Sequence, residues 1–249
     1  MIERCDLWRR TARRWAPVAV TGMMAMIGLS APHASGAAAQ EATPTIGVLD
    51  SVESLPECAP TEIGEVPADL SPAATYAIDA EESVARYRSV EELANVGTNE
   101  AVGETNAIVG QIYFDEAGMP LACSRFDVDL RTLQSDEARR DNYLYNNTLE
   151  TETYPLATFV LRAVEGLDAP LAEGEETPLT LIGDLTMHGV TKVVAWEATA
   201  TKEGDALTAT AATSFAMPEF EIEEPQVQVV VSIEDVIDLE VEIMATSAA

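Results

Sequence analysis

The chain has 249 residues, with 14 lysines and arginines against 43 aspartates and glutamates, and a formal net charge of −29 at pH 7. This acidic balance argues against binding to nucleic acid or to an anionic lipid surface, because both present phosphates that need cationic partners. With only two histidines in the chain, a multi-histidine metal site is excluded.

Residues 1–40 have the order of parts that is typical of a secretory signal. Five arginines come first, an apolar run follows from Ala16 to Ala31, and the small residues of "HASGAAAQ" come last. The apolar run is shorter than the about 20 residues that a bilayer span requires. We therefore expect cleavage near Ala39, no stable membrane anchor afterwards, and a periplasmic or secreted protein. Removal of five arginines and two acids leaves nine basic and 41 acidic residues, a net charge of −32.

Residues 41–72 form an acidic segment with several prolines and little periodicity, which predicts an arm or linker. Cys5 lies in the expected signal, so Cys58 and Cys123 remain as an even pair in an oxidising compartment, and we expect a disulfide between them. Strand parity places Cys123 on the polar outer face of its strand. The disulfide would then fasten the arm to the outside of the sheet.

Residues 73–249 are long enough for one domain with a single core, and the two-residue period of half-buried strands recurs through them. A hairpin is predicted over residues 107–130, with its turn at residues 116–118. The inward-facing residues of this hairpin are Ile112, Phe114, Phe126, Val128 and Leu130.

One helical segment is expected over residues 135–147, capped by Ser135 or Asp136. Beyond it, alternating apolar and polar residues predict further strands. These strands cover residues 154–164, 177–187, 192–201, 206–217 and 237–243. Many strands joined by short turns, with little helix, indicate an antiparallel sandwich or a closed barrel.

Six motifs along this domain can be compared with a known family. They are YAID at Tyr76, GQIYFD at Gly110, DVDLRTLQSDEARRDNYL at Asp127, YPLATF at Tyr154, GDLTMHGVTKVV at Gly183 and a closing acidic-apolar strand. In this order they closely resemble the YceI-like family of exported lipocalin-like, polyisoprenoid-binding proteins, over roughly residues 74–247. The resemblance implies an all-β fold, an extended antiparallel lipocalin-like barrel of about eight strands with one short helical segment, around an elongated apolar cavity for a lipid chain.

Two parts of the chain depart from the family's pattern. Glu81, Glu82 and Ser83 stand where the family often shows a histidine-serine pair, and residues 89–107 differ from the common sequence, which predicts a different barrel mouth. These departures affect the prediction of the ligand's head group more than the prediction of the fold. A diphosphate would be repelled at long range by the acidic chain, whereas a neutral quinone or fatty amide would not.

Inward-facing apolar residues are the candidates for a cavity wall, and ordinary core packing is the alternative for each. These candidates are Ile112, Phe114, Phe126, Val128, Phe159, Leu161, Leu185, Met187, Val194 and Trp196. Arg139, Arg140 and His188 are candidate contacts for a polar head group. The alternatives are an ion pair or helix cap for the two arginines and a turn-stabilising role for His188, which precedes Gly189.

Together these features predict an exported carrier that holds a long-chain isoprenoid, quinone or fatty-acyl lipid, with no cofactor and no metal. The alternative is an exported stress-response or protein-interaction module that acts through its acidic surface and arm without bound lipid. We expect no enzyme and no catalytic residue, because the sequence lacks a nucleophile elbow, a metal-ligand cluster and a second histidine after residue 40. The number of subunits stays open, with a homodimer among the alternatives.

Overall fold

The computed structural model describes residues 47–248 apart from 50–54, 60, 95 and 227–229. The chain divides into two units, Met1–Glu41 and Ala42–Ala249, and every described residue belongs to the second. The expected signal at residues 1–40 and the first part of the arm lie outside the described residues.

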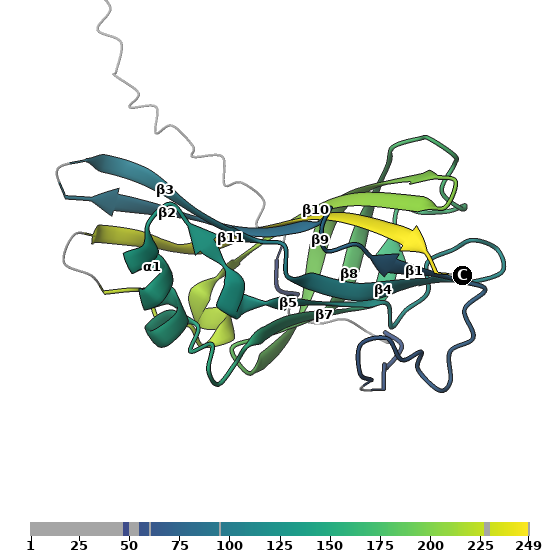
Figure 1. Ribbon diagram of the computed structural model, residues 1–249, viewed down its shortest axis with the longest axis horizontal. Helices are drawn as coiled ribbons and strands as arrows, with labels where there is room; N and C mark the ends of the chain where they lie inside the picture. The colour runs from purple at the N-terminus through teal and green to yellow at the C-terminus, as the bar shows by residue number, and fades with distance from the viewer. Residues whose placement is uncertain (1–46, 50–54, 60, 95, 227–229, 249) are drawn as a thin grey trace, which may run out of the picture. The chain divides into compact units, whose positions relative to one another are not determined.

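Eight strands of this unit close into an antiparallel barrel, which confirms the predicted fold class (Figure 1). The described residues form eleven strands in all, of which β2, β3 and β6 lie outside the closed ring. They are β1 (Ala74–Ile78), β2 (Val84–Leu93), β3 (Gly97–Thr105), β4 (Ile108–Phe114), β5 (Arg125–Asp129), β6 (Gln134–Ser135), β7 (Leu156–Glu165), β8 (Thr177–Met187), β9 (Val190–Glu203), β10 (Ala206–Ala216) and β11 (Val230–Ser247). Their order in the sheet is β1-β4-β5-β7-β8-β9-β10-β11-β2-β3-β6, and a β1–β11 pairing closes the ring. Closure leaves no free edge in the eight-stranded part.

The β8–β9 hairpin shows how the local sequence builds the wall. Apolar and polar residues alternate along β8, so that Leu185 and Met187 lie inside the barrel with exposures of 2% and 5%. Met187 pairs with Val190, and the two turn residues between them, His188 and Gly189, have φ values of 51° and 77°. Two left-handed residues match the twist of the flanking strands in a two-residue hairpin.

The β2–β3 hairpin extends the sheet beyond the barrel, and the sequence analysis did not predict it. β11 is 18 residues long, and while its end pairs with β1, its first part pairs with β2 (Figure 1). Two arginines on the outer face of β2 each connect acids on both neighbouring strands. These pairs are Arg86 with Glu104 and Glu242, and Arg88 with Glu100 and Glu240. The hairpin forms one wall of the open end of the barrel.

The expected helical segment is present but starts later than the sequence predicted. α1 spans Ala138–Tyr143, its cap is Glu137, and a π-helical turn, η2 (Leu144–Thr148), continues it. Neither Ser135 nor Asp136 is the cap. Ser135 lies in β6, where its hydroxyl donates to the nearly buried Asp141 at 2.6 Å. Short 3-10 helices follow β5 and β10, η1 (Leu130–Thr132) and η3 (Met217–Phe220), so Leu130 is not a strand residue.

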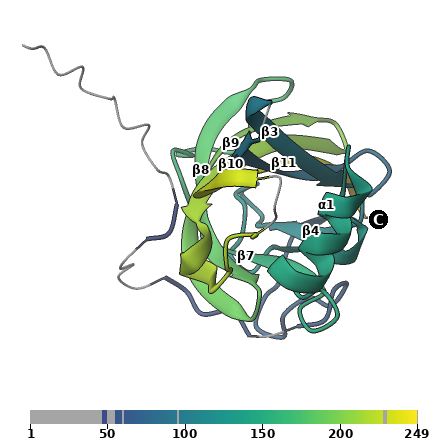
Figure 2. The same ribbon diagram turned by 90° about the vertical axis from the view of Figure 1, so that its left-hand side faces the viewer.

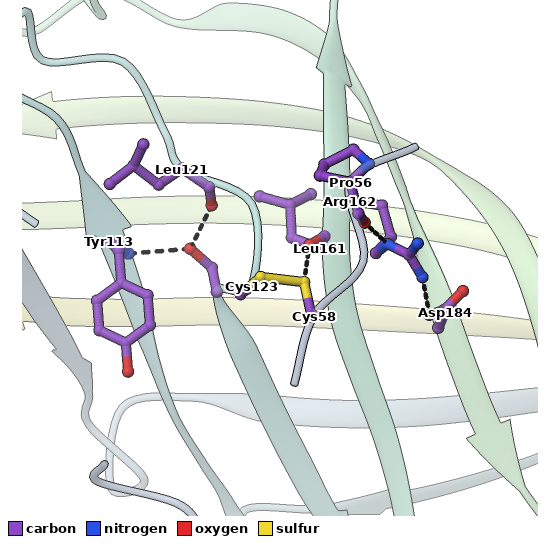
Figure 3. Close-up of a disulfide and its surroundings, with 9 residues drawn as sticks. Pro56, Cys58, Tyr113, Leu121, Cys123, Leu161, Arg162 and Asp184 are labelled. Atoms are coloured by element: carbon purple, nitrogen blue, oxygen red, sulfur yellow. Dashed lines mark hydrogen bonds and ion pairs between the residues drawn. A yellow bond between two sulfur atoms is a disulfide. The ribbon is translucent and has the colours of Figure 1, made fainter. Parts of the chain in front are cut away.

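The described part of the arm is fastened to the outer face of the barrel (Figure 3). Cys58 and Cys123 form a disulfide with a Cα–Cα distance of 5.4 Å. The expected place of Cys123 on a strand face is wrong, because β5 begins at Arg125 and Cys123 lies in the preceding turn with φ of 69°. Arg162 donates to the carbonyl of Pro56, and Arg125 donates to that of Thr61. The arm thus crosses the outside of the sheet, as the sequence predicts.

Candidate ligand cavity

A cavity of about 960 Å³ lies at the open end of the barrel. Residues of β2, β3, β11, α1 and η2 line it together with the adjoining parts of β5 and β7–β10. No residue of β1 or β4, which the structure describes in full, reaches its wall. Small-molecule sites usually measure about 300–1,000 Å³, so this cavity is at the large end of that range.

The opposite end of the barrel is filled by side chains. Tyr76 of β1 packs edge-on against Phe114 of β4, with ring centroids 5.3 Å apart, and both are almost fully buried. Ala245 of β11, which pairs with Ile78 of β1, has no exposed surface at all. This packed end gives the cavity a closed bottom, while the other end carries the opening.

Five of the ten apolar candidates line the cavity and five do not. Those on the wall are Phe126, Val128, Leu185, Met187 and Trp196. The remaining five are Ile112, Phe114, Phe159, Leu161 and Val194, which belong to the packed core and are absent from the cavity wall. All ten were assigned by strand parity, which gives the face of a strand but not the position along the barrel axis.

Phe159 lies directly behind the cavity wall and supports it. Its ring is 5.3 Å from the ring of Phe126 and 5.9 Å from that of Trp196, both of which face the cavity. A Cβ atom at Gly183 would approach the Phe159 ring to 2.6 Å, closer than real Cβ contacts come. Gly183 therefore makes the space for this ring, and the ring holds the aromatic part of the wall in place.

Two segments cover the open end from opposite sides. Figure 2, which faces this end, shows α1 and the following turn on one side and the segment after β10 on the other. Tyr143, Leu144 and Leu149 line the cavity from the first, and Met217 and Ile222 line it from the second. The backbone N–H of Gln226 donates to the hydroxyl of Tyr143 at 3.3 Å, which joins the two covers.

Arg140 lines the cavity, but its guanidinium already forms ion pairs with two acidic side chains. Its guanidinium is 2.9 Å from the nearly buried carboxylate of Glu91 and 2.6 Å from that of Asp136. Burial lowers the pKa of Arg140, but the hydrogen bond that Arg140 donates to Asp136 and the charge of Glu91 outweigh this and raise the pKa overall. Arg139 also lines the cavity, is exposed, and forms no ion pair with any described residue. Of the two arginines, Arg139 is the one free to contact a head group.

His188 does not line the cavity. Its Nδ1 lies 3.3 Å from the carbonyl oxygen of Phe220 and its Nε2 lies 3.2 Å from the carboxylate of Glu150. The imidazole packs edge-on against Tyr154, with centroids 4.8 Å apart. A Cβ at Gly189 would come within 2.7 Å of the Tyr154 ring. These contacts hold the β8–β9 turn against the segments that carry Phe220 and Glu150. They correspond to a turn-stabilising role for His188, the alternative to head-group contact.

Three polar side-chain atoms on the cavity wall have no hydrogen-bond partner among the described residues: the hydroxyls of Tyr87 and Thr148 and the indole Nε1 of Trp196. Burial raises the pKa of Tyr87 to about 12. Sequence analysis missed Tyr87 and Thr148, because the pairing of β2 and the π-helical turn that carry them were not predicted. The described residues contain no group of three or more potential ligands that could hold a metal ion. They also include no helix with the length and hydropathy of a membrane span.

Comparison with protein families gives one match that covers most of the chain. The model described as "YceI-like domain" matches residues 76–245. A protein from Pseudomonas putida (strain GB-1) called "UPF0312 protein" is 37% identical over 136 residues, which are 53% of this chain and 65% of that protein. One from Shewanella baltica (strain OS155) is 30% identical over 157 residues, 60% of this chain and 78% of that protein. The chain thus spans slightly less than two thirds of the Pseudomonas relative.

Solved structures with the same fold are more distant in sequence. A polyisoprenoid binding domain from Saccharophagus degradans, described as implicated in plant cell wall breakdown, superimposes with a TM-score of 0.57 at 17% identity, over 70% of this chain and 98% of that one. The protein BcnA of Burkholderia cenocepacia gives a TM-score of 0.54 at 18% identity, over 68% of this chain and 99% of that one. At these identities the similarity concerns the fold alone.

Proposed function

This chain belongs to the YceI-like family, and on that premise we propose that it is an exported carrier that holds a long, uncharged apolar molecule of the isoprenoid, quinone or fatty-acyl type in the barrel cavity. The observation that carries the proposal is the cavity of about 960 Å³, which is lined mainly by apolar and aromatic side chains. The solved Saccharophagus degradans domain of the same fold is described as polyisoprenoid binding, which is consistent with this class of ligand.

Hydrophobic burial supplies enough free energy for such a ligand. Each buried methylene contributes about 0.8 kcal/mol, so roughly 15 of them contribute about 12 kcal/mol. Association costs about 4–15 kcal/mol in lost freedom. A long chain can therefore be retained without a charged anchor, whereas a short one cannot. Because Arg140 is neutralised by Glu91 and Asp136, Arg139 is left as the free one of the two arginines, and a single positive charge does not balance a diphosphate.

The export part of the proposal is supported by the sequence of residues 1–40 and by the pairing of Cys58 with Cys123. Disulfides form and persist in oxidising compartments such as the periplasm. The arm does not favour the alternative of a free interaction module. Its described residues are held against the barrel by the disulfide and by Arg125 and Arg162.

The test is to express the full chain in a bacterial host that exports it, to purify it without detergent, and to analyse an organic extract by mass spectrometry. We expect an isoprenoid, quinone or fatty-acyl lipid in an amount comparable with that of the protein. A matched extraction of a variant with a filled cavity, Ala157→Trp, should contain much less. An empty extract, together with no uptake of such lipids on titration, would contradict the proposal.

A further inference from the structure

Part of one edge of β9 is not covered by its neighbour β10. β8 pairs with β9 along Val190–Ala200, whereas β10 pairs with β9 only along Glu197–Glu203. Beyond these pairs, residues 213–216 of β10 stay paired with β11 and leave β9. A seam therefore lies in the barrel wall, with residues 190–196 of β9 on one side and residues 213–216 of β10 on the other.

Residues 47–49 of the arm lie in this seam as a short strand piece. The N–H of Leu49 donates to the carbonyl of Val193 at 2.9 Å, and the N–H of Ala195 donates to the carbonyl of Gly47 at 3.3 Å. The partners on β9 are backbone groups of the edge that β10 leaves uncovered. Because backbone groups in a wall need hydrogen-bond partners, the arm completes the wall at this place.

Val48 occupies the place on this edge that β10 would otherwise take. The last pair between β9 and β10 is Glu197 with Ala212, and the same register would set Phe215 opposite Val194. Instead, Val48 forms an antiparallel bridge with Val194. Paired residues point to the same face of a sheet, and Val194 is fully buried in the core. Val48 therefore points inward, where it packs against that core.

The seam borders the ligand cavity. Trp196 on β9 and Phe215 on β10, which flank the seam, both line the cavity. The two strands are joined where the seam begins by the hydroxyl of Thr213, which donates to the carbonyl of Ala195 at 2.8 Å. A three-residue piece held by two backbone hydrogen bonds opens locally at a lower cost than the long strands beside it. The wall can therefore open at the seam while the rest of the barrel stays folded.

We propose that residues 47–49 are a removable part of the barrel wall, and that their release opens a side entrance to the cavity between β9 and β10. This inference rests on the proposed carrier function and adds the route by which a long apolar molecule enters and leaves. The open end of the barrel is covered by two segments that the hydrogen bond between Gln226 and Tyr143 joins, so a second route suits a bulky ligand. The disulfide at Cys58 keeps the released arm attached to the barrel, so that residues 47–49 can return.

The test changes how firmly this strand piece is held and follows the rates of ligand exchange. The probe is retinol, a neutral isoprenoid alcohol whose fluorescence rises in apolar surroundings. Its association with the full chain and its dissociation are measured by stopped flow, and its Kd by equilibrium titration.

One variant locks the strand piece and one loosens it. Val48→Cys/Val194→Cys locks it, because the Cα atoms of such an antiparallel pair lie about 4.5 Å apart, within the range for a disulfide. Mass spectrometry of peptides verifies the new bond. Leu49→Pro loosens the piece by removing the N–H that donates to Val193. The matched control is Ile63→Pro, at an exposed turn residue of the same arm whose N–H donates no hydrogen bond to a described residue.

We expect the locked chain to bind and release retinol about ten-fold more slowly, because local opening is blocked. Leu49→Pro should raise both rates about five-fold, the effect of one neutral hydrogen bond on the opening. Since an entrance changes both rates equally, Kd should stay within about two-fold in each variant, and the control should change neither the rates nor Kd.

Two results would overturn the side entrance. One is equal exchange rates in all the chains, which would mean that retinol passes through the covered open end. The other is a changed Kd without equal changes of the two rates, which would make residues 47–49 a fixed part of the wall. No binding of retinol by the unmodified chain would contradict the carrier function, and the side entrance with it.

Discussion

Removal of the Cys58–Cys123 disulfide should destabilise the protein strongly, although the bond lies outside the barrel. The cross-link closes a loop with a sequence separation of 65 residues, and in the chain-entropy model this loop contributes roughly 4 kcal/mol by restricting the unfolded chain. For a domain of this size, each kcal/mol corresponds to about 2–4 °C in Tm. We therefore expect Cys58→Ser/Cys123→Ser to lower the Tm by about 8–16 °C.

The assay is thermal unfolding followed by circular dichroism, with the unmodified protein measured before and after reduction. Reduction breaks the same bond without changing a side chain, so the reduced protein and the double variant should unfold at similar temperatures. Loss of the bond should also release the arm and make the peptide bonds near Pro56 sensitive to proteases. An unchanged Tm in both the reduced protein and the variant would refute the assignment of this bond as a stabilising cross-link.

Two further predictions concern ionisable groups at the cavity. Arg140→Gln should lower the free energy of unfolding by about 3 kcal/mol, because it leaves the buried carboxylate of Glu91 unpaired. The control, Arg139→Gln at the exposed neighbour, should change the free energy of unfolding by less than about 0.5 kcal/mol. Equal urea-unfolding midpoints for the two variants would contradict this prediction. Burial raises the pKa of Tyr87 to about 12, so the unfolded chain loses this proton first and stability should fall between about pH 10 and 12. Tyr87→Phe should reduce that loss by up to about 3 kcal/mol in denaturant titrations at several pH values, and an identical pH dependence would disprove the shift.

The parts of the fold that alternation specifies were predictable from the sequence. β8 spans Thr177–Met187, as its alternating pattern predicts, because each inward residue is apolar or small and each flanking turn carries its own signal. The turn at His188 and Gly189 was also readable, since two adjacent left-handed residues suit a two-residue hairpin. The order of the six motifs added the closed barrel, which alternation alone did not distinguish from a sandwich.

What could not be predicted depends on partners that are distant in the sequence. Arg86 and Arg88 look like ordinary surface charges until β3 and β11 place acids on both sides of them. Phe159 and Trp196 share the interior face, but only the closed barrel shows that Trp196 lines the cavity while Phe159 lies behind it. Thr148 belongs to a π-helical turn whose geometry no local pattern indicated. Periodicity gives the face of a residue, and tertiary packing decides its depth.

The central claim is that the cavity holds a long, neutral apolar molecule, and Trp196 offers a direct test because it lies on the cavity wall. The other tryptophans of the chain are Trp8 and Trp15, which lie in the expected signal, so a chain produced without residues 1–40 has Trp196 as its sole indole fluorophore. We would titrate this chain with phylloquinone, whose quinone ring quenches indole emission, and use N-acetyltryptophanamide as the control for nonspecific quenching. The account predicts saturable quenching at one ligand per chain that exceeds the control. Quenching that never saturates and matches the free indole would contradict it.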